Sequence, residues 1–323
     1  MIGKTGVVIA TIAASLAWTN GVFAQAYPTK PITIVNPWPP GAVTDMLARL
    51  VAEGMRVDLG QPAIVENRAG ASGTLGSAYV AKAKPDGYTL LVTVSAPITT
   101  NQFLQKNYPF DPLKELEPIS MITESALIIA VHPSMPVRTI EEFVDYARKN
   151  PGKLSYGTAG NGTAHHIAGE TLKRELGLDM VHVPFKGGAP SAQALIANVV
   201  PVAFCTVPTI LQAARAGRAR ILATTRRESL PDLPDVPPIS RVLPGFEAVS
   251  WVGFFAPGGT QQSIIARLNA AIVKVIKSPE VAEKARAEGN IVVGGTSEAL
   301  GKQVRAEIEK WGPIIKSLGI QNE

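Results

Sequence analysis

The clearest pattern of apolar and polar positions lies between residues 32 and 59. A short β-branched run at 32–35 is followed by a loop with three prolines and a glycine, and then by apolar residues at helical spacing over 46–59. The pattern predicts a strand, a turn and a helix, with Thr44 as the N-cap and Asp45 as a negative charge in the first turn. Backbone N–H groups at such a turn have no partner inside the helix, so they attract a carboxylate or a phosphate.

The order of strand, small-residue loop and helix recurs along the chain. Further strands are predicted at residues 62–66, 88–94, 119–123, 126–131, 154–157, 180–183, 200–204, 220–224 and 250–256. The βαβαβ order at the start favours a parallel sheet covered by helices, with ligands at the carboxyl ends of the strands. We expect an α/β fold of two domains with a cleft between them. Residues 27–125 and 249–323 would form the first domain, and residues 126–248 the second.

Residues 1–26 have the pattern of a secretory signal peptide. Lys4 precedes an apolar stretch, and Ala24-Gln25-Ala26 offers a cleavage site before Tyr27. No later apolar run has the length of a membrane-spanning helix. These features predict a soluble, exported product.

Charge and cysteine content exclude several classes of protein. The net charge is +5, with basic residues scattered along the chain and aromatic residues at 6%. Nucleic-acid binding is therefore not expected. The one cysteine, Cys205, excludes an internal disulfide, and a lone cysteine at a strand end is usually a small buried hydrophobe.

The loop from Thr158 to Thr163 is the second candidate for anion binding. The glycines around it run in the reverse order of a dinucleotide fingerprint, and no acidic residue follows at the required distance. A cradle of backbone N–H groups and threonine hydroxyls fits better. His165 and His166 are adjacent and point to different faces of a helix, so we predict no metal site and no cofactor.

Catalytic patterns are weak. Ser95 ends a strand and could meet His165, but no third member of a triad is evident, which leaves an exported serine hydrolase as the lesser alternative. The loops at the strand ends are rich in hydrogen-bond donors and poor in acid–base pairs. That balance describes binding without chemistry, in a two-lobed protein whose cleft closes by hinge motion. We therefore expect no enzyme.

A series of motifs carries a specific resemblance. They are Tyr27-Pro28-x-Lys30-Pro31-Ile32, Pro39-x-Gly41-x-x-Thr44-Asp45, Gly60-Gln61-Pro62, Val65-Glu66-Asn67-Arg68-x-Gly70-Ala71, Pro85-Asp86-Gly87-Tyr88-Thr89-Leu90, Pro151-Gly152-Lys153-Leu154, Gly160-Asn161-Gly162-Thr163-x-His165, His182-Val183-Pro184-Phe185-Lys186-Gly187, Leu233-Pro234-Asp235-Val236-Pro237, Ser250-Trp251 and Ala256-Pro257-x-Gly259-Thr260. In this order they resemble the solute-binding proteins of tripartite tricarboxylate transporters, also called the Bug family, over essentially all of the chain after residue 26.

The resemblance implies a periplasmic binding protein of type II with two α/β domains joined by crossing strands. It implies a small carboxylate as ligand, delivered to the membrane permease subunits of the transporter, and we expect a monomer. One carboxylate would lie between the first βα loop and the facing loop of the second domain. The expected ligand-binding residues are Trp38, Pro40, Gly41, Ala42, Val43, Thr44, Asp45, Ser95, Ala96, Thr158, Ala159, Gly160, Asn161, Thr163, His165, Phe185, Lys186, Gly187 and Cys205.

Two departures from the family pattern bear on the ligand. Ala42 and Val43 follow Gly41 where the family commonly has glycine next, which makes the pocket more apolar. Cys205 stands where many members carry an aspartate that could meet an ammonium group. With Trp38 and Phe185 near the mouth, these residues favour an acid with an apolar body, such as an aromatic mono- or dicarboxylate, over an amino acid. Aliphatic di- and tricarboxylates, and a sensory rather than a transport role, stay open.

Overall fold

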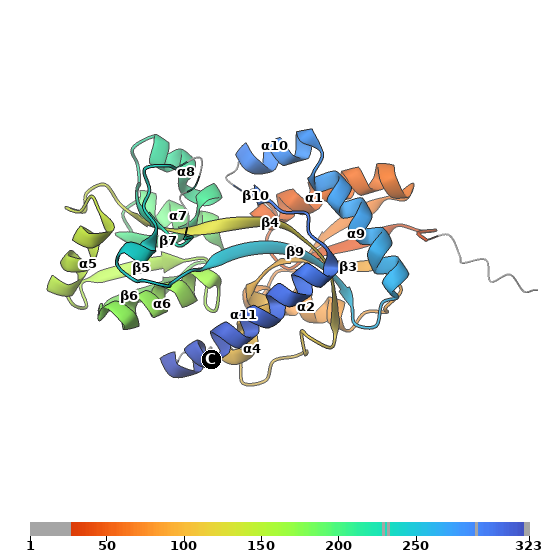
Figure 1. Ribbon diagram of the computed structural model, residues 1–323, viewed down its shortest axis with the longest axis horizontal. Coiled ribbons are helices and arrows are strands. Elements are labelled where there is room, and N and C mark those ends of the chain that lie inside the picture. The colour runs from red at the N-terminus through yellow and green to blue at the C-terminus, as the bar shows by residue number, and fades with distance from the viewer. Residues whose placement is uncertain (1–26, 228–229, 231–232, 288–289, 320–323) are drawn as a thin grey trace, which may run out of the picture.

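The computed structural model describes residues 27–227, 230, 233–287 and 290–319, and the predicted signal peptide, residues 1–26, lies outside the described residues. Two groups of helices and strands lie side by side, and two long strands, β4 (Leu116–Val131) and β9 (Val249–Pro257), run between them (Figure 1). We call the group that contains residues 32–104 the first lobe and the group that contains residues 140–224 the second lobe. The expected mixed α/β fold is confirmed.

The first lobe is built from both ends of the chain. Its N-terminal elements are β1 (Ile32–Asn36), α1 (Val43–Leu59), β2 (Ala63–Asn67), the 3₁₀ turn η1 (Ala71–Gly73), α2 (Thr74–Ala81), β3 (Thr89–Val94), α3 (Ala96–Thr99) and α4 (Asn101–Leu104). Its C-terminal elements are α9 (Gln262–Ile276), α10 (Pro279–Ala287), β10 (Ile291–Val292) and α11 (Ser297–Leu318). The two long strands are β4 (Leu116–Val131) and β9 (Val249–Pro257).

The second lobe is continuous in sequence. Its elements are α5 (Ile140–Lys149), β5 (Leu154–Thr158), α6 (Ala164–Leu176), β6 (Met180–Pro184), α7 (Gly188–Ile196), β7 (Val202–Thr206), α8 (Val207–Arg215), β8 (Arg220–Thr224) and the 3₁₀ turn η2 (Ile239–Arg241).

Both lobes use one strand order. In the first lobe the order is β2-β1-β3-β9-β4, and in the second lobe the strands pair as β6-β5-β7-β4-β8. The first three strands of each set are parallel, and the crossing strand is antiparallel to them. Each set therefore directs the carboxyl ends of its parallel strands toward one edge, where βα turns can face a ligand.

Strand β4 belongs to both sheets. It pairs with β9 from Leu116 to Ala126 and with β7 from Leu127 to Val131. The sequence predicted two strands here, at residues 119–123 and 126–131. In the structure Glu124 and Ser125 pair with Trp251 and Ser250 of β9, so the two are one continuous strand, and the Glu124 side chain forms an ion pair with Arg226.

Four apolar clusters fill the two lobes. Two consist mainly of first-lobe residues and two mainly of second-lobe residues. Helix α11 contributes to both kinds, with Leu300 and Val304 in a first-lobe cluster and Trp311 and Ile315 in a second-lobe cluster. The predicted domain boundaries, at residues 125/126 and 248/249, fall where β4 and β9 pass from one lobe to the other. The division into two domains itself stays a prediction.

Helix α1 begins earlier than the sequence pattern predicted. Its N-cap is Ala42 and not Thr44, and Ala42 makes no side-chain capping bond. Thr44 lies inside the first turn. Apolar spacing alone could not locate this start because Val43 and Thr44 precede the first core-facing leucine, Leu47.

Candidate functional site

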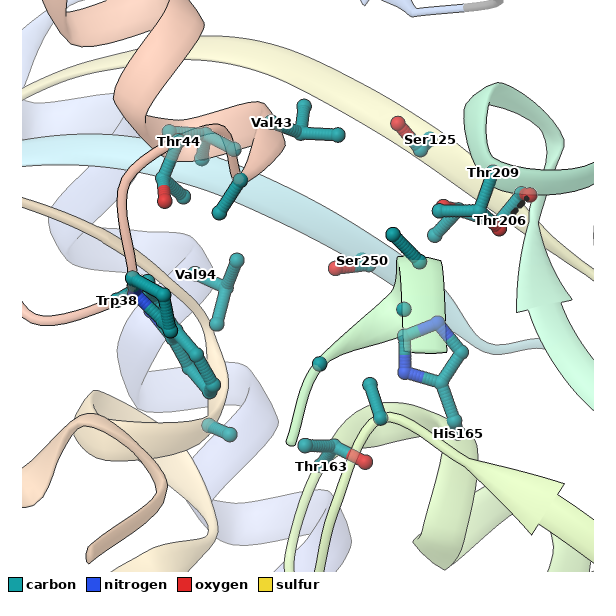
Figure 2. Close-up of a pocket in the computed structure, with 18 of the residues that line it drawn as sticks. Trp38, Val43, Thr44, Val94, Ser125, Thr163, His165, Thr206, Thr209 and Ser250 are labelled. Carbon is teal, nitrogen blue, oxygen red and sulfur yellow. Dashed lines mark hydrogen bonds between the residues drawn. The ribbon is translucent and has the colours of Figure 1, made fainter. Parts of the chain in front are cut away.

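A cavity of about 290 Å³ lies between the lobes. Figure 2 shows Trp38, Val43 and Thr44 entering it from one side and His165 from the other. The lining residues are Trp38, Pro39, Pro40, Gly41, Ala42, Val43, Thr44, Val94, Ser95, Ala96, Ser125, Ala159, Thr163, Ala164, His165, Lys186, Gly187, Gly188, Ala189, Pro190, Thr206, Thr209, Ser250, Val252 and Asn290.

The turn from β1 to α1 forms one wall. Asp45 folds back over this turn, and its carboxylate accepts hydrogen bonds from the backbone N–H of Gly41 at 3.0 Å and from Asn67 at 2.9 Å. Arg49 pairs with the same carboxylate at 3.0 Å. Burial alone would raise the pKa of Asp45, but these partners outweigh it and hold the pKa below its usual value.

Two donors at the α1 turn stay available. The backbone N–H groups of Val43 and Thr44 are the first two of the helix, and neither has an acceptor among the described residues. The buried hydroxyl of Thr44 also has no hydrogen-bond partner there. Because all three groups belong to residues that line the cavity, they can bind an anion beside the positive end of the helix dipole.

The turn from β5 to α6 forms the opposite wall. Thr163 is the N-cap of α6, and its hydroxyl accepts from the N–H of His166 and donates to the carbonyl of Gly160 at 2.8 Å. The next two N–H groups, those of Ala164 and His165, have no acceptor among the described residues. The second turn therefore presents the same pair of backbone donors as the first.

The His165 ring projects into the cavity (Figure 2). The residue is 7% exposed, and neither ring nitrogen has a hydrogen-bond partner in the described chain. Burial lowers the pKa of His165 to about 4. The imidazole is therefore neutral near pH 7, with one N–H donor and one lone pair unpaired.

Several lining side chains come from segments that sequence reasoning did not select. Ser125 lies on β4, Ser250 and Val252 on β9, and Thr206 and Thr209 at the junction of β7 and α8. The hydroxyl of Ser125 donates to the Asn290 side chain at 2.7 Å, across 165 residues of sequence. Two of them had a usable signal, since Thr206 follows Cys205 at a predicted strand end and Ser250 belongs to the motif Ser250-Trp251.

Thirteen of the nineteen expected residues line the cavity, and six do not. The thirteen are Trp38, Pro40, Gly41, Ala42, Val43, Thr44, Ser95, Ala96, Ala159, Thr163, His165, Lys186 and Gly187. The six that the structure places elsewhere are Asp45, Thr158, Gly160, Asn161, Phe185 and Cys205. A bound ligand would test each assignment, so the ligand-binding roles of the thirteen stay predictions.

Two of the six, Asp45 and Thr158, have side chains that are hydrogen-bonded inside the loops. Asp45 holds its own turn together, as described above. The hydroxyl of Thr158 lies 2.7 Å from His182 Nε2 and accepts from the N–H of Gly160 at 3.3 Å. Gly160 and Asn161 belong to the same turn as Thr163 but do not line the cavity.

The other two of the six pack inside the second lobe. Phe185 packs against an apolar cluster that contains Cys205, which is 1% exposed. Burial raises the pKa of the Cys205 thiol to about 12. Because side chains alternate along a strand, the neighbour Thr206 faces the cavity in place of Cys205.

The cavity carries no negative side chain. Among the described residues that line it there is no aspartate or glutamate, and Lys186 and His165 are the ionisable groups. Four free backbone N–H groups at two helix starts add positive potential. This balance favours an anion and disfavours an ammonium group.

The geometry gives no support to nucleophilic catalysis by Ser95. His165 has no hydrogen bond to Ser95 or to any other described residue, and its low pKa makes it a weak base. Within residues 27–319, apart from the gaps stated above, no group of three metal-ligating side chains is present. No helix of that part of the chain is long and apolar enough to span a membrane.

Comparison with known families agrees with this picture. Residues 47–320 match the model of the TctC family, described as the tripartite tricarboxylate transporter family receptor. The chain belongs to this family. The membership confirms the expected resemblance, and it makes the chain a solute receptor and not an enzyme.

Individual relatives of this TctC-family chain support the assignment. The protein BugT of Bordetella pertussis is 31% identical over 300 residues, which cover 92% of each chain. A Rhodopseudomonas palustris protein solved with adipate has a TM-score of 0.85 and 32% identity, covering 91% of this chain and 99% of that one. MatC from the same organism, solved with bound malate, has a TM-score of 0.82 and 32% identity, covering 90% of this chain and all (100%) of that one.

Proposed function

We propose that this TctC-family receptor works in the periplasm, where it captures a carboxylate with an apolar body and delivers it to the membrane subunits of a tripartite transporter. The observation that carries the proposal is a set of four backbone N–H groups, on Val43, Thr44, Ala164 and His165, that have no acceptor among the described residues. The described residues that line the same cavity include no aspartate or glutamate. Two helix starts that face one cavity from opposite sides can share one carboxylate.

The walls around this position suit an apolar body. Trp38, Val43 and Val94 line the first-lobe side, and Ala96 and Ala164 add small apolar surface. An aromatic ring or a methylene chain would bury apolar area against the Trp38 ring. Relatives solved with adipate and malate bind aliphatic dicarboxylates, so both kinds of body belong in the test.

Calorimetry and thermal shift against a panel of acids test the proposal. The panel contains adipate, succinate, malate, benzoate, phthalate and 4-hydroxybenzoate, with the methyl esters as matched neutral controls. We expect at least one acid to bind and its ester to fail, because the neutral ester carbonyl accepts more weakly than a carboxylate and carries no negative charge to interact with the two helix starts. A ligand at about one hundred times its dissociation constant adds roughly 2.7 kcal/mol to the free energy of unfolding.

The panel is run on protein that has been unfolded in denaturant, dialysed and refolded, so that no co-purified ligand masks binding. If no acid shifts the melting temperature of the refolded protein, the carboxylate proposal is rejected. Delivery is tested separately by uptake of the labelled acid in cells with and without this chain. Size-exclusion chromatography with light scattering tests the expected monomer.

A further inference from the structure

His165 is the polar side chain of the cavity whose hydrogen-bonding capacity is least used. It is 7% exposed, both of its ring nitrogens lack partners among the described residues, and the ring projects into the cavity (Figure 2). A buried donor or acceptor without a partner is unfavourable, so a ligand that pairs with the ring gains affinity.

The neutral ring sets a specific demand on its partner. In either tautomer it offers one N–H donor and one lone pair. A carboxylate can accept from the N–H, but it has no hydrogen to give to the lone pair. The lone pair needs a donor, and an ammonium group is disfavoured because no aspartate or glutamate lines the cavity within the described residues. An uncharged donor such as a hydroxyl fits this demand.

Other neutral groups in the cavity can complete the environment of a hydroxyl. The side chains of Thr206, Ser250 and Ser125 line the same cavity, and the Asn290 amide nitrogen is a buried donor without a partner. Lys186 is the other ionisable lining side chain, and it is exposed. The lining therefore has donors for a hydroxyl oxygen and, in His165, an acceptor for its hydrogen.

We infer that His165 is a specificity-determining residue that selects carboxylates bearing a hydroxyl group, by accepting a hydrogen bond from that hydroxyl. The inference rests on the proposed function, since it assumes that the carboxylate itself binds the backbone N–H groups of the two turns. It adds a hydroxylated acid as the substrate class.

Paired probes that differ by one hydroxyl test the inference. Isothermal titration calorimetry compares malate with succinate, 4-hydroxybenzoate and 3-hydroxybenzoate with benzoate, and 6-hydroxyhexanoate with hexanoate. In the pair that binds most tightly, we expect the hydroxylated acid to bind about tenfold more tightly. Because the ring stays neutral, that affinity should change less than about twofold between pH 6 and pH 8.

Two variants and one control separate selection from a general loss of structure. His165→Leu should reduce the preference to within about twofold and leave the affinity of the unhydroxylated acid within about threefold. His165→Gln, which keeps an acceptor, should retain part of the preference. His132→Leu, whose ring bonds to Ser134 and does not line the cavity, should leave the preference intact.

The possible failures are distinct. Tight binding of acids without a preference for the hydroxylated member overturns the inference and leaves the proposed function standing. A preference that persists in His165→Leu also overturns it, as does an affinity of the hydroxylated acid that rises about tenfold for each unit of falling pH, which would show proton uptake by the ring. Failure of every acid to bind rejects the proposed function itself.

Discussion

The turns before α1 and α6 face each other across the cavity and reach the same backbone geometry by different means. Their N-cap residues, Ala42 and Thr163, share φ and ψ values of −65° and 157°. Thr163 caps its helix with its own hydroxyl, whereas Ala42 has none and the Asp45 carboxylate holds the N–H of Gly41 instead. Each turn nevertheless leaves the next two N–H groups without partners among the described residues.

The comparison shows which property of the site depends on side chains. Anion-binding N–H groups follow from the start of a helix, so two unlike sequences supply them equally. The side chains beside them differ, because the first turn brings the indole of Trp38 and the second brings the imidazole of His165. The backbone thus provides the common carboxylate site, and the side chains determine which acids fit around it.

The largest expected difference between the turns is their response to acid. His165 and His166 lie in the first turn of α6, and His182 stacks on His166 with ring centres 3.9 Å apart, whereas no histidine adjoins the α1 turn. Burial lowers the pKa of His166 to about 4 and that of His182 to about 3. The unfolded chain therefore binds protons at a higher pH than the folded protein does.

These lowered pKa values make stability fall as pH drops below about 6.5, by roughly 1.4 kcal/mol per pH unit for each of the buried His165 and His166 and by less for the partly buried His182. The loss continues until pH reaches the folded pKa values of about 3 to 4. Urea unfolding at pH 7, 6 and 5 measures the slope. His182→Gln should reduce it by less than one third. A free energy of unfolding that is constant from pH 7 to pH 5 would contradict the assignment.

The second difference is how much each turn depends on its capping group. Asp45→Ala removes a carboxylate that is 4% exposed and holds Gly41, Asn67 and Arg49, so we expect a loss of about 2–3 kcal/mol in unfolding free energy. Thr163→Ala removes one cap and should cost about 1 kcal/mol. Urea denaturation of both variants gives the comparison.

Thr296→Ala is the matched control for the cap, because Thr296 caps α11 in the same way and does not line the cavity. It should lose about as much stability as Thr163→Ala and keep full ligand affinity. If Thr163→Ala costs as much as Asp45→Ala, the two capping modes are energetically equal and the contrast is wrong.

The smallest expected effect on stability comes from changes to the shared donors, whose loss shows in ligand affinity instead. Val43→Pro and Ala164→Pro each remove one free N–H at the first position of a helix, where proline is tolerated, and the residue before each is extended as proline requires. Each change should weaken carboxylate binding about tenfold with little change in melting temperature. Isothermal titration calorimetry, with an acid that binds the wild type, measures the affinity of each variant, and thermal unfolding measures its melting temperature.

Controls separate the N–H from other changes at these positions. Val43→Ala shows the effect of the valine side chain alone. Gln262→Pro places proline at the start of α9, whose residues do not line the cavity, and should leave affinity unchanged. Equal losses from the two turns would support a carboxylate shared between them. A loss from one turn only would assign the carboxylate to that turn.

The sequence by itself determined the succession of strands and helices and the positions of the two turns. Apolar periodicity and small-residue loops are local signals, and a helix start leaves N–H groups free whatever its sequence. The motifs also identified the family. The misplaced N-cap at Thr44 lies two residues from the true N-cap Ala42, so the sequence found the turn, whereas the structure assigned the free donors to Val43 and Thr44.

Only the tertiary structure decided which side chains enter the cavity and which are already occupied. The sequence left the Asp45 carboxylate and the Thr158 hydroxyl as candidate ligand contacts. In the structure both are hydrogen-bonded to other residues, up to 24 positions away in the sequence. The register of β7 directs the Thr206 side chain toward the cavity and the Cys205 side chain into the core. Ser125 and Asn290 meet across 165 residues, which no local pattern can show. Donors of the backbone follow from local geometry, whereas the direction and pairing of side chains depend on contacts distant in sequence.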